Sequence, residues 1–250
     1  MAESLDVLVA DLAAEQDALQ TLLADIADDD WLRPTPAEGW DVRDSVSHLA
    51  DTDEIARDTV LDGPRSFPKE LDVKGPEGFN QQGLDRGRSM AGPEVLAWWR
   101  TSSAAEREAL AGAPPDQRVP WGIGMSVTSL VTARLMETWA HGLDVYEALG
   151  SEPVDTDRLR HVAWIGVRAL PYAFGVAGRE APPGELRVEL DLPSGARFTA
   201  GPDDAGNRIT GPAGQFCRLF VQRITRAEAP DLTASGPLAD AALDVARAYL

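Results

Sequence analysis

The sequence predicts a helical N-terminal bundle followed by a small α+β domain. Two observations carry this prediction. Apolar residues recur at intervals of three, four and seven through most of the first 150 residues, whereas residues 186–192 alternate strictly between apolar and charged. A chain of 250 residues is long enough to build two such cores. We therefore expect a bundle domain over residues 1–152 and an α+β domain over residues 153–250.

Four helices are expected in the first domain. Their predicted ranges are residues 5–26, residues 42–61 with Asp41 as N-cap, residues 93–110, and residues 126–149 with Gly150 as C-cap. Four helices within about 150 residues are typical of a four-helix bundle.

The segment between the second and third helices, residues 62–92, is polar and rich in glycine and proline. Its length exceeds that of ordinary loops, which rarely pass ~15 residues. It is therefore a functional loop, a mobile loop, or a segment that holds a short helix whose position the pattern does not give.

The second domain mixes both element types. Leu186 to Leu192 reads as a half-buried strand, Pro193-Ser194-Gly195 as a turn, and Arg197 as the start of the returning strand. Helices are expected over residues 157–174, 213–225 and 237–250.

The acidic composition of the chain excludes some classes of binding partner. With 23 Lys+Arg against 41 Asp+Glu, the formal net charge is −18, which argues against nucleic acid and anionic membranes as partners. The N-terminal residues lack the pattern of a secretory signal, and no run approaches the ~18 apolar residues of a membrane span. The single cysteine, Cys217, suits a reducing compartment. We expect a cytoplasmic monomer or homodimer that binds a small molecule.

The spacing of three side chains indicates a metal site. His141 follows Glu137 by four residues, which places both on one helix face, although an exposed Glu–His pair gives the same spacing. His48 lies within the second helix, where a lone histidine is more often a core or boundary residue. Bundles receive metal ligands from facing helices, and three protein ligands with an open fourth position define a catalytic zinc site. Asp144 is placed to accept the second N–H of His141, or else is an exposed helix residue.

Two motifs resemble a known family. The segment from Pro36 to Asp44 followed by His48-Leu49, together with residues 134–150 (RLMETWAHGLDVYEALG), is similar to the DinB-like, mycothiol-dependent maleylpyruvate isomerase superfamily. The likeness is closest to an actinobacterial branch of metal-binding proteins. In that superfamily a histidine of the second helix and a Glu-x-x-x-His of a later helix hold the metal, which correspond to His48, Glu137 and His141 here.

The resemblance extends to residues 159–174 and 208–223, and it implies a C-terminal domain similar to sterol-carrier-type folds. It also implies that Arg223 is the arginine of that domain that faces the active site, as a catalytic and cofactor-binding residue. A solvated helix arginine is the alternative interpretation of Arg223.

The resemblance further implies a metal-dependent enzyme, with zinc as the expected ion and mycothiol as cosubstrate, that works as an S-transferase or an isomerase. Trp164, Leu170 and Ala200 depart from the branch pattern and would reshape a pocket. These departures favour an alternative, a thiol-independent hydrolase, lyase or cyclase that uses the same metal. A third possibility is a non-catalytic protein that binds a metal or a small ligand.

Overall fold

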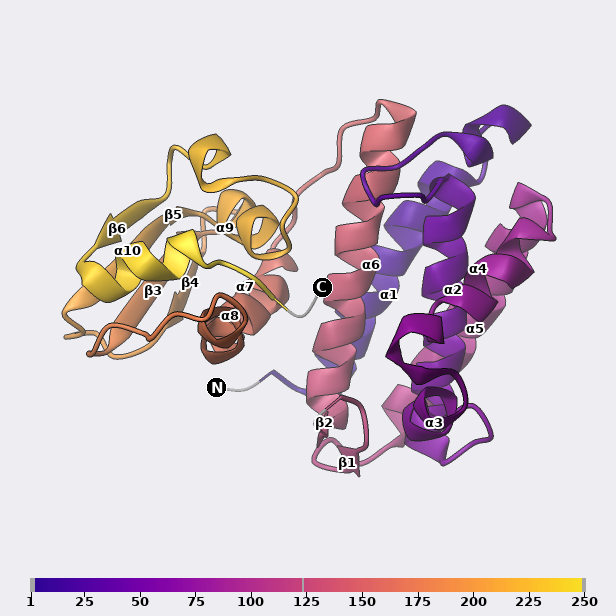
Figure 1. The fold of residues 1–250 in the computed structure, drawn as a ribbon, viewed down its shortest axis with the longest axis horizontal. Coiled ribbons are helices and arrows are strands. Elements are labelled where there is room, and N and C mark those ends of the chain that lie inside the picture. The colour runs from indigo at the N-terminus through magenta and orange to yellow at the C-terminus, as the bar shows by residue number, and fades with distance from the viewer. Residues whose placement is uncertain (1–2, 123, 249–250) are drawn as a thin grey trace. The chain divides into compact units, whose positions relative to one another are not determined.

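The structure is a computed structural model that describes residues 3–122 and 124–248. The chain divides into two compact units, Met1–Pro153 and Val154–Leu250 (Figure 1). Whether each unit folds as an independent domain stays a prediction. None of the helices within the described ranges is both long enough and apolar enough to cross a membrane.

The first unit is helical, and all four expected helices are present. Its elements are α1 (Leu5–Leu23), the 3-10 helix η1 (Asp28–Leu32), α2 (Val42–Leu61), α3 (Phe67–Gly78), α4 (Gln81–Arg88), α5 (Gly92–Gly112), β1 (Arg118–Val119), β2 (Met125–Ser126) and α6 (Val127–Leu149). Helices α1, α2, α5 and α6 pack along one another (Figure 1). The first helix ends at Leu23 rather than at residue 26, because the chain turns into η1 at Asp28.

The ends of α2 and α6 are fixed by their caps. The Asp41 carboxylate accepts a hydrogen bond from the Asp44 amide at 2.8 Å, and the Asp44 carboxylate accepts one from the Asp41 amide at 3.3 Å. This reciprocal pair satisfies two amide groups that a helix start leaves without partners. At the other end of the unit, Gly150 stops α6 with a φ of 64°, a conformation in which glycine has no steric penalty.

The polar segment 62–92 contains the helices α3 and α4, so of its three interpretations the short-helix one holds. The sequence did not reveal α4, because its glycines are typical of loops, whereas here they allow close helix packing. A Cβ on Gly83 would lie 2.7 Å from Cβ of Asp51, and one on Gly87 would lie 1.8 Å from Oγ of Ser47. The two glycines are one helical turn apart, and they allow α4 to approach α2 closely.

Charged side chains meet in the centre of the first unit. The guanidinium of Arg134 on α6, 1% exposed, donates to Asp53 on α2 at 2.7 Å and to Glu106 on α5 at 3.2 Å. Gln16 of α1 donates to the other oxygen of Glu106, and the Trp99 indole donates to the other oxygen of Asp53 at 3.0 Å. The resulting Arg134 network links all four long helices.

A mixed four-stranded sheet organises the second unit. Its strands β3 (Leu186–Asp191), β4 (Arg197–Ala200), β5 (Asn207–Pro212) and β6 (Thr233–Ser235) are ordered β4-β3-β5-β6. The predicted hairpin forms, with Leu190 opposite Phe198. Strand β5 runs parallel to β3, and β6 is antiparallel to β5. The helices α7 (Leu159–Arg168), α9 (Ala213–Phe220) and α10 (Pro237–Asp244) pack against the sheet (Figure 1).

Some sequence-based ranges in the second unit were wrong. The helix expected over 157–174 is two helices, α7 and α8 (Leu170–Val176), because Pro171 lacks the N–H that would continue α7. The expected helix over 213–225 ends at Phe220, and the one over 237–250 ends at Asp244, while residues 249–250 lie outside the described chain. Strands β5 and β6 were not foreseen.

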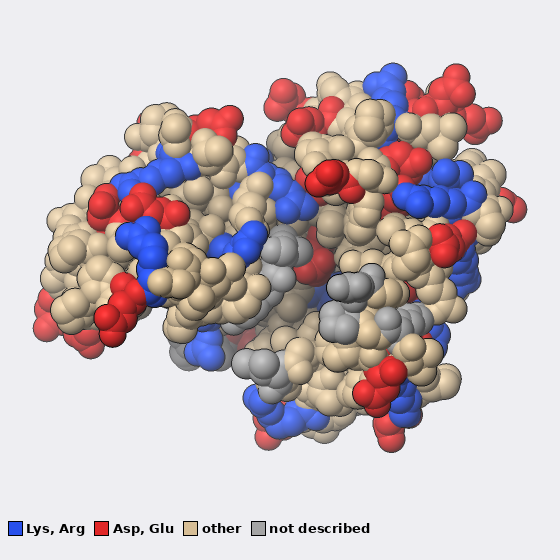
Figure 2. All heavy atoms as spheres, in the orientation of Figure 1, with Lys and Arg blue, Asp and Glu red and all other residues tan. Residues whose placement is uncertain are grey.

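The acidic excess is spread rather than concentrated. Acidic and basic side chains are interspersed over the face that Figure 2 shows. Several carboxylates share one arginine: Arg65 contacts Asp51 at 2.8 Å, Glu54 at 2.5 Å and Glu70 at 3.1 Å. On this face, therefore, the net charge of −18 is not gathered into one acidic patch.

Replacement of Arg134 by methionine tests the importance of its network. Arg134→Met keeps much of the side-chain volume but leaves the buried Asp53 without its cation and Glu106 without a donor, so we expect a loss of ~3–5 kcal/mol in the free energy of unfolding. Arg33→Met, whose partly exposed ion pair with Asp30 is worth at most ~1 kcal/mol, is the control. Urea unfolding followed by tryptophan fluorescence reports on the first unit, because of the seven tryptophans only Trp164 lies beyond Pro153. Equal losses in the two variants would contradict the prediction.

A pH series tests the protonation of Glu106. Burial, and then the charge of Asp53, raises the pKa of Glu106 well above its ordinary value of 4.5, against the opposing effect of Arg134. The folded state thus keeps a proton that the unfolded state releases near pH 4.5, so this contribution to stability is present below that pH and is lost as the pH rises through the folded pKa.

Glu106→Gln removes this titration and keeps a hydrogen-bonding side chain of the same shape. We expect the stability of the Gln variant relative to wild type to increase as the pH rises above 4.5. Urea midpoints at several pH values measure the difference, with Glu108→Gln on the exposed face of α5 as the control for loss of a carboxylate. A difference that stays constant with pH would show that Glu106 is ionised in the folded protein.

Candidate metal centre

The side chains of His48, Glu137 and His141 converge between α2 and α6. Nε2 of His48 lies 3.5 Å from Oε2 of Glu137, and Nε2 of His141 lies 3.6 Å from the same oxygen. One ligand atom from each of the three residues lies within 4.8 Å of the others. Both imidazoles are buried, at 9% and 8% exposure, and Glu137 is partly exposed.

This geometry fits a divalent ion. With Zn–N and Zn–O bonds of about 2.0–2.1 Å, neighbouring ligands of a tetrahedral ion are about 3.3 Å apart, close to the two separations seen here. Two imidazole nitrogens and one carboxylate oxygen form a donor set found in catalytic zinc sites, in which the fourth position is left open. The same donors also suit iron, nickel or manganese, so the donor set alone does not choose the metal.

The three groups shift one another's pKa values. Burial lowers the pKa of His48, and the neighbouring His141 adds to this effect while Glu137 opposes it. Burial alone would raise the pKa of Glu137, but the two imidazoles outweigh it and lower that pKa strongly. For His141 burial acts downward, yet the carboxylates of Asp144 and Glu137 prevail and raise its pKa. The carboxylate form of Glu137, which is the ligand form, is therefore favoured.

Asp144 lies behind His141 on the same helix. Its Oδ2 is 3.4 Å from Nδ1 of His141, and the side chain of Asp144 is 1% exposed. The interpretation of Asp144 as an exposed helix residue is therefore wrong. A carboxylate on Nδ1 favours the tautomer that carries its proton there, which leaves the lone pair of Nε2 directed toward Glu137.

Trp40 was not foreseen as a part of this centre. Its ring stacks on His141, with centroids 5.6 Å apart and planes 20° from parallel, and it lies tilted over His48 at 5.2 Å. The sequence offered one signal, the position of Trp40 directly before the N-cap Asp41 of the helix that carries His48.

Arg223 belongs to the second unit, in the segment after α9. Its Nη1 donates to the carbonyl of Val221 at 2.7 Å, and the residue lines a hollow of about 360 Å³ together with Gln222, Arg226 and Asp244. Arg223 therefore borders a cavity of the second unit. Its catalytic role stays a prediction.

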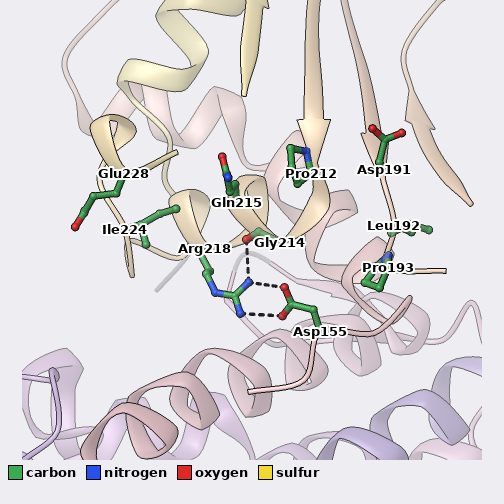
Figure 3. A pocket seen from close by; sticks show the side chains of 10 residues that line it. All are labelled: Asp155, Asp191, Leu192, Pro193, Pro212, Gly214, Gln215, Arg218, Ile224 and Glu228. Atoms are coloured by element: carbon green, nitrogen blue, oxygen red, sulfur yellow. Dashed lines mark hydrogen bonds and ion pairs between the residues drawn. The ribbon is translucent and has the colours of Figure 1, made fainter. Parts of the chain in front are cut away.

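A second hollow of about 410 Å³ lies beside the carboxyl ends of β3 and β5 (Figure 3). Arg218 reaches into it from α9 and forms a paired contact with Asp155, at 2.7 and 2.8 Å. A Cβ on Gly214 would lie 2.4 Å from Oδ2 of Asp155, so glycine makes room for this pair. The sequence did not indicate Arg218 as a lining residue of a hollow. Burial raises the pKa of the fully buried Cys217 thiol well above its ordinary value, as expected of an unreactive core cysteine.

The first unit of the chain matches a known protein family. A sequence model described as the mycothiol maleylpyruvate isomerase N-terminal domain matches residues 12–146, more than half of the chain. The chain belongs to the mycothiol maleylpyruvate isomerase family. The matched range includes both α2 and α6, and with them all three members of the candidate metal centre.

Individual relatives resemble nearly the whole chain. Two relatives, each described as an uncharacterized protein, come from two strains of Mycobacterium tuberculosis. Each is 40% identical over 244 residues, which cover 96% of this chain and 94% of the relative.

Among solved structures, the crystal structure of a mycothiol-dependent maleylpyruvate isomerase is similar with a TM-score of 0.62 and 16% identity. The similarity covers 95% of this chain and 96% of that chain, and a histidine-to-alanine mutant of the isomerase gives a TM-score of 0.61. At this identity the likeness concerns the fold: helices combined with a small sheet. The similarity of the second unit to sterol-carrier-type folds stays a prediction.

The support that Asp144 gives to His141 can be measured through metal affinity. In Asp144→Asn the carboxylate that orients Nδ1 is lost, and we expect Zn²⁺ to bind ~10–100-fold more weakly. Glu147→Gln, an exposed position one turn further along α6, should bind Zn²⁺ as the wild type does. Competition against a chromogenic chelator gives both constants, and equal affinities would remove Asp144 from the centre.

Proposed function

We propose that this protein is a metal-dependent enzyme that uses mycothiol as cosubstrate on a small organic electrophile, as an isomerase or an S-transferase. The observation that carries the proposal is the convergence of Nε2 of His48, Nε2 of His141 and Oε2 of Glu137 in a member of the mycothiol maleylpyruvate isomerase family. We propose these three residues as the metal ligands and zinc as the ion.

When bound, a divalent ion at this centre supplies Lewis acidity, which favours the thiolate form of a thiol at neutral pH. The chain's own residues prepare the centre. His48 and His141 offer nitrogen lone pairs from two different helices, and the negative charge of Asp144, 3.4 Å from Nδ1 of His141, favours a proton on that nitrogen. Burial of both imidazoles excludes water from the side of the centre that faces the helices.

Both reactions begin with addition of the mycothiol thiolate to an electrophilic carbon of the substrate. In an S-transferase a proton is taken up, and the adduct leaves with its new carbon–sulfur bond. In an isomerase a carbon–carbon double bond becomes single, rotates and re-forms as the thiolate is expelled, so the thiol is recovered. We propose that Arg223 binds a carboxylate of the substrate, because a guanidinium matches a carboxylate with two parallel hydrogen bonds.

The proposal is tested with protein purified without an affinity tag. We expect stoichiometric metal by elemental analysis, loss of that metal in Glu137→Gln, and retention in Glu147→Gln, whose exposed carboxylate lies further along α6. Mycothiol should bind to the metal-loaded wild type, as measured by calorimetry, and maleylpyruvate or another electrophile should then be isomerised or consume thiol. Arg223→Gln should raise KM more than it lowers kcat.

Three outcomes would contradict parts of this proposal. Metal-loaded protein that neither binds mycothiol nor consumes thiol would exclude the thiol-dependent reaction, and turnover without thiol would favour a hydrolase, lyase or cyclase at the same centre. Retention of metal in Glu137→Gln together with His48→Ala would exclude the centre itself and favour a ligand-binding protein.

A further inference from the structure

Trp40 forms an aromatic cover over the two histidines of the candidate metal centre. It contacts both rings, and the two imidazoles meet edge to face with centroids 4.7 Å apart and planes at 64°. All three centroid separations fall within the ~4.5–7 Å at which aromatic rings attract one another. The three rings therefore form one cluster beside Glu137, to which both Nε2 atoms lie close.

The backbone on both sides of Trp40 holds the indole in this place. The amide of Trp40 donates to the carbonyl of Ala37 at 3.0 Å, and the amide of Thr35 donates to the carbonyl of Trp40 at 2.9 Å. Pro34 and Asp41 form an antiparallel bridge across this turn, and Gly39 within it has a φ of 77°, which glycine adopts without strain. The position of the indole is thus built into the turn.

Packing of a core does not account for this placement. Three other tryptophans, Trp31, Trp98 and Trp99, are buried in the main apolar cluster of the first unit, whereas Trp40 is only partly buried and stands outside that cluster. Its ring partners are the two imidazoles. Because Trp40 lies outside the apolar core and over two proposed ligands, we look for its role at the metal centre.

We propose that Trp40 is a positioning residue that strengthens metal binding by covering both imidazole ligands. This inference rests on the metal centre of the proposed function. A cation on Nε2 withdraws electrons from an imidazole, and the electron-rich face of an indole stabilises such a positively polarised ring. Stacking also fixes the plane of His141, so that its Nε2 stays directed toward Glu137. On the other side of the ring, Oδ2 of Asp144 lies 3.4 Å from Nδ1.

Titration of the full-length protein with Co²⁺ tests the inference with two readouts that do not depend on activity. Co²⁺ quenches tryptophan emission at short range, and its visible absorption reports the geometry of the ligands. The variants are Trp40→Leu, which removes the aromatic face, and Trp40→Phe, which keeps an aromatic ring. Trp164→Phe is the matched control, because Trp164 is 48% exposed and lies in the second unit.

We expect Trp40→Leu to bind Co²⁺ about 10-fold more weakly than wild type, with a changed visible spectrum and an unchanged melting temperature of the metal-free protein. Trp40→Phe should bind nearly as wild type but lose much of the quenching, which Trp164→Phe retains. Trp40→Leu that binds with wild-type affinity and spectrum would overturn the inference. If Trp40→Leu fails to fold, Trp40→Phe decides, since undiminished quenching there would place Trp40 away from the ion.

Failure of the proposed function gives a different result. A wild-type protein that binds no Co²⁺ refutes the metal centre, and the role of Trp40 falls with it. A wild type that binds Co²⁺, with Trp40→Leu binding equally well, refutes only the role of Trp40.

Discussion

The hydrogen bonds of the buried Arg134 to Asp53 and Glu106 join the helices of the first unit in its interior. A buried guanidinium is tolerated only where its charge and its N–H groups are satisfied, so the helices that carry the partners must keep a fixed spacing. Thr52 extends this constraint to the metal centre: it accepts from Arg134 at 2.8 Å and donates to the carbonyl of His48 at 2.7 Å. Since Glu137 follows Arg134 by one turn of α6, the contacts that join α2 to α6 also set the distance between the proposed ligands.

The polar character of α2 follows from its central place in the unit. It packs against α3, α4, α5 and α6, and three of its buried aspartates each bind an arginine from outside the helix. Asp44 binds Arg88 at 2.8 Å, Asp51 binds Arg65 at 2.8 Å, and Asp53 binds Arg134. Within this pattern His48 differs, because its polar partners are the two other proposed metal ligands rather than a single structural counter-ion. The proposed ligand His48 thus lies between residues of α2 that form structural ion pairs.

Residue spacing was sufficient for the long helices and for the pairing of Glu137 with His141, since apolar periodicity and the four-residue interval both depend on local helix geometry. The approach of His48 to this pair was expected from the packing of facing helices and from the family resemblance, and the role of the three as metal ligands stays a proposal. Residue spacing failed to predict structure where the role of a residue depends on tertiary contacts. Gly83 and Gly87 read as loop residues, because only the proximity of α2 shows that they are contact positions. Strand β6 has three residues and exists through its pairing with β5. Trp40 and Arg218 were missed for the same reason, as the rings and the carboxylate that they meet are distant in sequence.

The turn before α2 contains both the residue that caps the helix and the residue that covers the proposed centre. Asp41 caps the helix, and the residue directly before it covers the two imidazoles, so the first turn of α2 and the aromatic cover share one short stretch of backbone. Fraying of this helix end, an ordinary local opening, would uncover the ligands while the Arg134 network and the rest of the bundle stayed intact. Access to the centre would then be governed by the stability of a single helix cap, on a free-energy scale far smaller than that of global unfolding.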